Sequence, residues 1–204
     1  MRVLNRRRVL AVAFTLLILA VVPSYIRAFS IVGDSDAPAL VSGDRVLVNL
    51  TAYDVRLPYS HRSLVRLGDP GPGDLVLFRD SEDRLVVKRV LAGPGTRVAM
   101  RENHVAVDGV ALEYSAVDPR TREAVGRGRL GDVVEIERGN GPDVYVSFDS
   151  ERGGRESVED QLVPEGCFYV LGSNRDAAMD SRDFGPVPRE RILGKVAGRV
   201  WSAG

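Results

Sequence analysis

Short apolar runs rich in valine recur along this chain, and turn signals separate them. Runs of this length, bounded by glycine and proline, are typical of antiparallel strands rather than of alternating strand and helix units. The predicted strands cover residues 45–50, 74–78, 84–91, 97–100, 104–107, 132–136, 144–148 and 167–171. Turns are predicted at residues 71–74, 93–95, 108–109 and 139–143. The sequence therefore predicts a mainly β fold.

The N-terminus carries a different pattern, a basic flank before a long uncharged run. Four arginines within residues 1–8 precede residues 9–26, which are 18 residues without a charge. A helix of that length spans about 27 Å, close to the hydrocarbon thickness of a bilayer. Because basic flanks stay in the cytoplasm, we predict a cytoplasmic N-terminus at 1–8, a transmembrane anchor at 9–28 and an exported domain at 29–204. The alternative is a cleaved export signal, with Ala28-Phe29-Ser30 as its small-x-small cleavage site.

Composition excludes several classes of function. Lysine plus arginine and aspartate plus glutamate number 28 each, so no excess of charge points to nucleic acid. Cys167 is the single cysteine, which excludes an intramolecular disulfide, and we expect it to pack in the core. With only His61 and His104 beside it, the chain offers no zinc ligand set and no catalytic histidine triad. We expect no metal and no cofactor.

Candidate chemistry lies in a serine and a lysine. Ser35 follows the N-terminal run within Gly33-Asp34-Ser35-Asp36-Ala37-Pro38-Ala39-Leu40, and Lys88 lies in the strand-like Leu85-Val86-Val87-Lys88-Arg89-Val90. A serine hydroxyl is a poor nucleophile at neutral pH unless a base is within hydrogen-bond reach. Apolar neighbours such as the valines around Lys88 disfavour its ammonium form, so that its neutral amine can be that base.

A third segment lies near the C-terminus: Gly172-Ser173-Asn174-Arg175-Asp176-Ala177-Ala178-Met179-Asp180-Ser181-Arg182. The chain resembles the bacterial type I signal peptidases, the Ser-Lys protease family S26, in the order of five features. These are the basic anchor, Ser-x-x-Pro-x-Leu-x-x-Gly-Asp, Gly-Asp-Leu-Val-Leu-Phe, Lys-Arg-Val and this C-terminal segment. The resemblance covers most of the chain. It implies an antiparallel β catalytic domain with a variable β insertion, here at about residues 103–165.

The resemblance also implies roles for individual residues. Ser35 would be the acylating nucleophile and Lys88 the general base. Asp180 and Arg182 would pair, and Arg89 would join them to orient the Lys88 strand. The substrate would bind as an extended strand along the edges near residues 29–33 and 85–88, with a small-x-small preference before the scissile bond. The residues expected to line its pockets are Ile31, Val32, Gly33, Leu40, Val86 and Val87.

Four positions depart from the family pattern. Asp36 replaces the usual methionine after the nucleophile, and Ser173 replaces an aspartate. Ala178 stands where many members carry a hydroxyl that bonds the catalytic amine. Gly33 stands where some members have a serine that donates to the oxyanion, which leaves the backbone N–H of Ser35 for that role. These changes leave the nucleophile and base intact and bear on efficiency and substrate range.

We therefore expect a membrane-bound serine endopeptidase that removes N-terminal signal peptides from exported preproteins. It would be a single-pass protein of the cell membrane, with a cytoplasmic N-terminus and its catalytic domain on the exported side. Its partners would be preproteins and the lipid bilayer, with no nucleic acid, and no oligomeric state is predicted. The alternatives are a specialised maturation protease and a catalytically weakened or inactive membrane-tethered β module that binds peptides.

Overall fold

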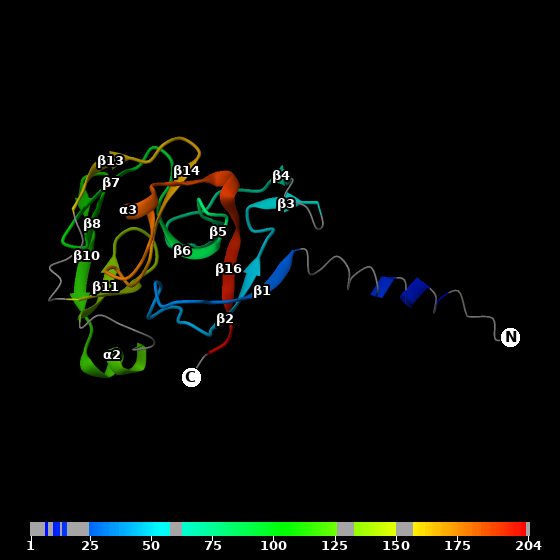
Figure 1. The fold of residues 1–204 in the computed structure, drawn as a ribbon, viewed down its shortest axis with the longest axis horizontal. Coiled ribbons are helices and arrows are strands. Elements are labelled where there is room, and N and C mark those ends of the chain that lie inside the picture. Colours follow the sequence, from blue (N-terminus) through cyan, green and yellow to red (C-terminus); the bar gives the residue numbers. More distant parts are fainter. Residues whose placement is uncertain are drawn as a thin grey trace.

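A curved antiparallel sheet of seven strands forms the larger part of the fold. The computed structural model describes residues 7, 10–12, 14–15, 25–57, 63–125, 133–149 and 157–202. In spatial order the sheet contains β1 (Ile26–Ser30), β2 (Arg45–Asn49), β16 (Ile192–Trp201), β5 (Leu75–Arg79), β6 (Leu85–Ala92), β14 (Cys167–Leu171) and β15 (Val187–Pro188). In Figure 1, β16 stands between β1 and β2 on one side and β5 and β6 on the other.

Two smaller sheets are built mainly from the segment between β6 and β14. One contains β13 (Val158–Leu162), β7 (Arg97–Arg101), β8 (His104–Val107) and β9 (Val110–Ala111), and the other β10 (Glu113–Ala116), β11 (Val133–Arg138) and β12 (Val144–Phe148). They lie on the opposite side of the molecule from β1, with α2 (Pro119–Val125) below them in Figure 1. Because β7 pairs with β8 and β13, this β subdomain begins at Arg97 rather than at the predicted residue 103.

The remaining elements are short. A separate hairpin pairs β3 (Asp54–Arg56) with β4 (Ser63–Arg66), while α3 (Ser181–Phe184) and the 3₁₀ helix η3 (Arg189–Arg191) flank β15. The predicted turn at Asp108-Gly109 joins β8 to β9, and both of its residues have positive φ, 49° and 78°. Two consecutive positive φ values match the two-residue hairpin turn whose twist suits antiparallel strands.

Both faces of the seven-stranded sheet are covered, and β5 shows why. Its side chains alternate, so Val76 and Phe78 pack in one core cluster while Leu77 packs in another with Leu40 and Val46. A third cluster, which includes Tyr169 and Leu171 of β14, extends toward the β subdomain. The site described below therefore rests on a sheet held from both sides.

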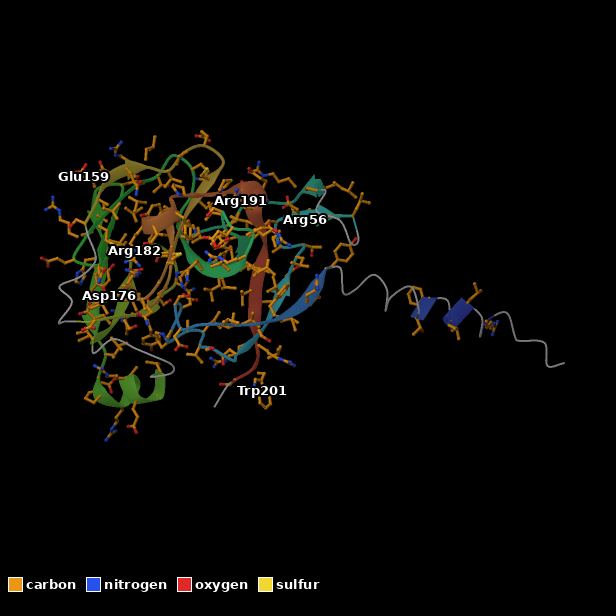
Figure 2. The ribbon with its side chains drawn as sticks, in the orientation of Figure 1. Arg56, Glu159, Asp176, Arg182, Arg191 and Trp201 are labelled. Atoms are coloured by element: carbon orange, nitrogen blue, oxygen red, sulfur yellow. The ribbon has the colours of Figure 1, made fainter. Side chains whose placement is uncertain are left out.

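All eight predicted strands are confirmed to within two residues at each end, and so is the mainly β fold. The sequence missed several strands, of which β1 and β16 matter most because they complete the sheet. Gly194 and Gly198 interrupt the valine pattern of β16, and Gly194 packs against the backbone of Asn49, where a side chain would not fit. Trp201 ends β16 with its side chain exposed (Figure 2).

Most of the predicted anchor at 9–28 lies outside the described residues. Its predicted C-terminal end is wrong, since Ile26, Arg27 and Ala28 belong to β1, where they pair with β2 through Ile26↔Asn49 and the pairs that follow. Backbone groups used in a sheet cannot also complete a helix. No helix among the described residues is long and apolar enough to cross a membrane. An anchor before Tyr25 stays a prediction.

Candidate active site

Ser35 lies in the loop between β1 and β2, and backbone hydrogen bonds shape this loop from both sides. The N–H of Leu40 donates to the carbonyl of Asp36 at 3.0 Å, and the N–H of Asn174 donates to the carbonyl of Ser35 at 3.2 Å. The N–H of Ser42 donates to the carboxylate of Asp34 at 2.9 Å. The nucleophile candidate is therefore held by its own loop and by the segment that follows β14.

Lys88 reaches Ser35 from the middle of the sheet. It lies on β6 opposite Val76 of β5, and only 2% of its surface is exposed. Its Nζ lies 2.5 Å from Oγ of Ser35, although the two residues are 53 positions apart in the sequence. This is the nucleophile and base contact that the Ser35 and Lys88 expectation requires.

The surroundings of Lys88 favour its neutral form. Burial lowers the pKa of Lys88, because the ammonium ion loses its hydration. The carboxylates of Asp36 and Asp180 act in the opposite direction, and the guanidinium of Arg182 adds to the lowering. The pKa of Lys88 remains below its ordinary value, as a general base near neutral pH requires.

Gly172 explains why the third segment can approach so closely. A Cβ at this position would overlap the carbonyl oxygen of Ser35 and the methyl group of Ala178, and it would lie 3.5 Å from Nζ of Lys88. Glycine is thus needed for close packing rather than for an unusual φ. The site consists of the Ser35 loop, β6 and the start of the 172–182 segment.

Asp180 and Arg182 pair as the sequence suggested. Nε of Arg182 donates to Oδ1 of Asp180 and NH2 to Oδ2, each at 2.8 Å, and both side chains are buried. Asp180 also caps α3 and accepts the N–H of Gly172 at 2.9 Å. Arg182, labelled in Figure 2, lies within 3.4 Å of the amide oxygen of Asn103, in the turn between β7 and β8 of the β subdomain. The ion pair of Asp180 and Arg182 therefore holds Gly172 close to the amine of Lys88.

Arg89 does not join this pair. Its NH1 donates to the carbonyl of Gly73 at 2.7 Å, and it makes no hydrogen bond or ion pair with Asp180 or Arg182 within the described ranges. Neighbouring residues of a strand point to opposite faces, so Arg89 and Lys88 point in different directions. Arg89 instead fixes β6 to the turn that precedes β5.

A cavity of about 210 Å³ opens beside Ser35. Five of the six predicted substrate-binding residues line it: Ile31, Val32, Leu40, Val86 and Val87. Gly33 does not line it, and its φ of +85° serves the loop instead. Phe29, Ser30 and Leu85 also line it and lie within the two edges predicted to pair with the substrate, whereas Asp36 and Leu77 were not expected to line a pocket.

Asp36 and Ser173 are in contact. Oδ1 of Asp36 accepts the backbone N–H of Ser173 at 3.0 Å and its hydroxyl at 2.9 Å, and both residues are buried. They are 137 positions apart, so spacing could not reveal the contact. The available signal was that both positions depart from the family pattern, one gaining and the other losing a carboxylate.

Arg175 forms a second buried cationic centre next to the site. Its NH2 donates to Oε2 of Glu137 at 2.6 Å, NH1 to the carbonyl of Asn103 at 3.1 Å and Nε to the carbonyl of Gly172 at 3.3 Å. The carboxylate of Glu137 raises the pKa of Arg175, against the effect of burial. Arg175 therefore joins Gly172 to the β subdomain, a role the sequence did not predict.

The histidines and the cysteine considered in the sequence are not placed at the Ser35 site. His104 stacks edge-on against Tyr114 with ring centroids 4.2 Å apart, and Cys167 is half-buried in β14. His61 lies outside the described residues. Among the residues with described positions, no three His, Cys, Asp or Glu side chains are grouped to hold a metal ion.

The family model and the curated relatives agree with one another. A family model described as "Signal peptidase, peptidase S26" matches residues 5–201. Signal peptidase IB of Staphylococcus aureus is 26% identical over 194 residues, which cover 95% of this chain and 87% of that protein. Signal peptidase I of Pseudomonas aeruginosa is 31% identical over 190 residues, or 86% of this chain and 64% of that protein. A crystal structure of a signal peptidase I from Enterococcus faecalis aligns with a TM-score of 0.40 and 24% identity over 63% of this chain and 97% of that chain.

Proposed function

Since this chain belongs to the type I signal peptidases of family S26, which are serine endopeptidases, we propose that Ser35 and Lys88 form the dyad with which it removes signal peptides from exported preproteins. The observation that carries this proposal is the 2.5 Å separation of Lys88 Nζ and Ser35 Oγ at a buried position. His104, the histidine whose position the structure describes, lies on β8 in the subdomain and not at this site.

The proposed reaction has two halves. The neutral amine of Lys88 accepts the Ser35 hydroxyl proton while Oγ attacks the scissile carbonyl, and the resulting ammonium protonates the leaving amine. Water then attacks the acyl-enzyme, with Lys88 again accepting the proton. The backbone N–H of Ser35 is the proposed donor to the oxyanion, and it donates to no acceptor among the described residues.

Substrate binding is proposed to use the cavity beside Ser35. An extended segment that pairs with a strand edge presents alternate side chains to one face. The apolar side chains of Ile31, Leu40 and Val86 would then surround small residues before the scissile bond. In this arrangement Asp180 and Arg182 act as positioning residues, because Asp180 bonds Gly172, Arg182 bonds Asp180, and neither lines the cavity.

We further propose that the chain is a single-pass membrane protein. Type I signal peptidases are generally membrane-associated, and the uncharged run after the basic N-terminus suits an anchor with the catalytic domain on the exported side. Since β1 begins at Ile26, the anchor would end at about Ser24 and the catalytic domain would begin at Tyr25. The substrate site would then lie close to the membrane surface.

The direct test is cleavage of a radiolabelled preprotein by the detergent-solubilised full chain. Wild type should release the mature protein, and Ser35→Ala should release none. Ser42→Ala is the matched control, because Ser42 lies in the same loop with its side chain exposed, and it should cleave at the wild-type rate. Equal turnover by wild type and Ser35→Ala would refute the proposed nucleophile.

The anchor has its own test. A chain that starts at Tyr25 keeps β1 and the site, so it should still cleave a short soluble peptide. Its activity on preprotein embedded in vesicles should fall much further, because tethering raises the local concentration of enzyme and substrate at one surface. Equal losses on the two substrates would contradict the proposed anchoring.

A further inference from the structure

The cavity beside Ser35 is lined by a carboxylate residue, Asp36, which a site for apolar side chains does not need. Its wall is mostly aliphatic and aromatic, and Asp36 is the single charged residue among the residues that line it. Ser35 also lines the cavity, so a side chain that enters it lies next to the proposed nucleophile. A carboxylate in this position changes which small side chains fit.

Only one oxygen of Asp36 is used by the protein. Oδ1 accepts both hydrogen bonds from Ser173, while Oδ2 is buried and has no hydrogen-bond partner in the part of the chain that the structure describes. Asp36 as a whole is 4% exposed. Buried polar atoms in folded proteins nearly always have a partner, and a carboxylate oxygen is a strong acceptor. The missing donor is therefore expected to arrive with the substrate.

We propose that Asp36 selects signal peptides with a small hydroxyl-bearing residue, serine in the first place, immediately before the scissile bond. This inference rests on the proposed function. Ser35 attacks the carbonyl of that residue, and Asp36 follows Ser35 in the chain and lines the same cavity. The substrate hydroxyl donates to Oδ2 of Asp36 and completes its hydrogen bonding.

Ser173 contributes by fixing the orientation of the carboxylate. With both Ser173 donors on Oδ1, the carboxylate cannot rotate freely to offer either oxygen. An apolar side chain of the same size would leave Oδ2 as unpaired as it is in the free chain, so only the hydroxyl-bearing substrate gains a hydrogen bond there. Alanine likewise offers no donor to Oδ2, so its peptide should also be cleaved less well than the serine peptide.

The test uses three peptides that differ only in the residue before the scissile bond: serine, 2-aminobutyrate and alanine. 2-Aminobutyrate has a methyl group in place of the serine hydroxyl, so size is matched. The full chain in detergent should cleave the serine peptide with a kcat/KM at least about tenfold above that of the 2-aminobutyrate peptide. Measurements are made at a pH where kcat/KM has reached its plateau.

Asp36→Met should reduce the serine to 2-aminobutyrate ratio to about one or below, because the thioether side chain offers no comparable acceptor. The ratio compares two substrates of the same enzyme sample, so partial misfolding of the variant cancels. Ser173→Ala keeps the carboxylate and should retain part of the serine preference. The same pair of residues placed two positions further from the scissile bond should give a ratio of about one.

Three results would overturn the proposal. If wild type cleaves the serine and 2-aminobutyrate peptides equally, and Ser35→Ala cleaves neither, the substrate backbone or water satisfies Oδ2 and the peptidase function stands without this selectivity. A serine preference that survives unchanged in Asp36→Met also excludes Asp36 as its source. If wild type cleaves no peptide and no preprotein, the proposed function fails together with the selectivity.

Discussion

Lys88 and Arg175 are both only 2% exposed, yet the protein treats their charges in opposite ways. Arg175 lies against the carboxylate of Glu137 and two backbone carbonyls, and its pKa is raised. Lys88 donates, in the described part of the chain, to the Ser35 hydroxyl alone, and its pKa is lowered. A buried cation with an ion-pair partner, such as Arg175, serves as a structural link. A buried amine whose hydrogen-bond partner is a neutral hydroxyl, such as Lys88, gives up its proton more readily.

The residue types fit this division. A guanidinium stays protonated at any usable pH and binds several acceptors in a plane, whereas an ammonium changes its pKa readily on burial. Arg175 connects the 172–182 segment to Glu137 of β11 and to Asn103. It therefore helps to fix the segment whose first residue, Gly172, packs near Lys88. Lysine and arginine should therefore not be interchangeable at these two positions.

The largest effect is expected for activity when the base is changed. Lys88→Arg should lower kcat/KM by about 10²–10⁴-fold, because the guanidinium cannot accept the Ser35 proton. The matched control is Lys195→Arg, the same change at the half-exposed lysine that pairs with Asp74, and it should remain close to wild type. Activity of Lys88→Arg within tenfold of wild type would assign the base to another residue.

The next effect is on stability and concerns Arg175. Glu137→Ala should lower the free energy of unfolding by about 3–5 kcal/mol, because it leaves a buried guanidinium without its carboxylate. Asp143→Ala, which breaks the exposed pair with Arg138, should cost less than about 1 kcal/mol. Urea unfolding of the two variants checks this, and equal losses would mean that the Arg175 pair is no more than a surface contact.

Lys88→Met should have the opposite effect on stability, although it abolishes turnover. The pKa of Lys88 is lower in the folded than in the unfolded chain, so unfolding takes up a proton and is favoured at lower pH. Methionine removes this penalty. The variant should be more stable than wild type near neutral pH, and the difference should shrink as the pH rises toward about 10.4, the unfolded lysine value. A gain that does not depend on pH would argue against proton linkage at Lys88.

The smallest effect is expected from Asp36. Its carboxylate opposes the lowering of the Lys88 pKa, as do Asp180 and Asp183, while Arg182 acts in the other direction. Asp36→Met should therefore move the ascending limb of kcat/KM toward lower pH, because that limb reports the free enzyme's base. Asp36 is buried and bonded to Ser173, so solvent screening does not remove this coupling. A limb that stays in place would show that the two groups do not interact.

Sequence reasoning was accurate where structure depends on local pattern. The strands around Val76 and Lys88 were predicted because alternation and turn residues act within a few positions. The contact of Ser35 with Lys88 was an expectation from family resemblance, since local rules do not relate positions 53 apart. The contacts of Asp36 with Ser173 and of Arg175 with Glu137 depend on the packing of distant segments, so no spacing in the sequence reveals them.

The same limit explains the error over Arg89. Family order placed it beside Lys88 and suggested a shared role with Asp180 and Arg182. Strand geometry turns it to the opposite face, where it bonds the Gly73 carbonyl.

At the N-terminus, the hydropathy pattern extended the predicted anchor to Ala28. In the structure, Ile26–Ser30 instead pair with β2 as a strand of the sheet. In both regions, contacts between segments distant in sequence determine where the residues lie.

Titration of the Lys88 amine is the most direct check that Lys88 is the base for Ser35. The chain has two lysines, Lys88 and Lys195, so lysine labelled with ¹³C at Cε gives two side-chain signals, and Lys195→Arg identifies them. We predict that the Lys88 signal titrates below about 10.4, the ordinary lysine pKa, in the folded full chain. A Lys88 signal that titrates at or above that value would contradict its role as the base that activates Ser35.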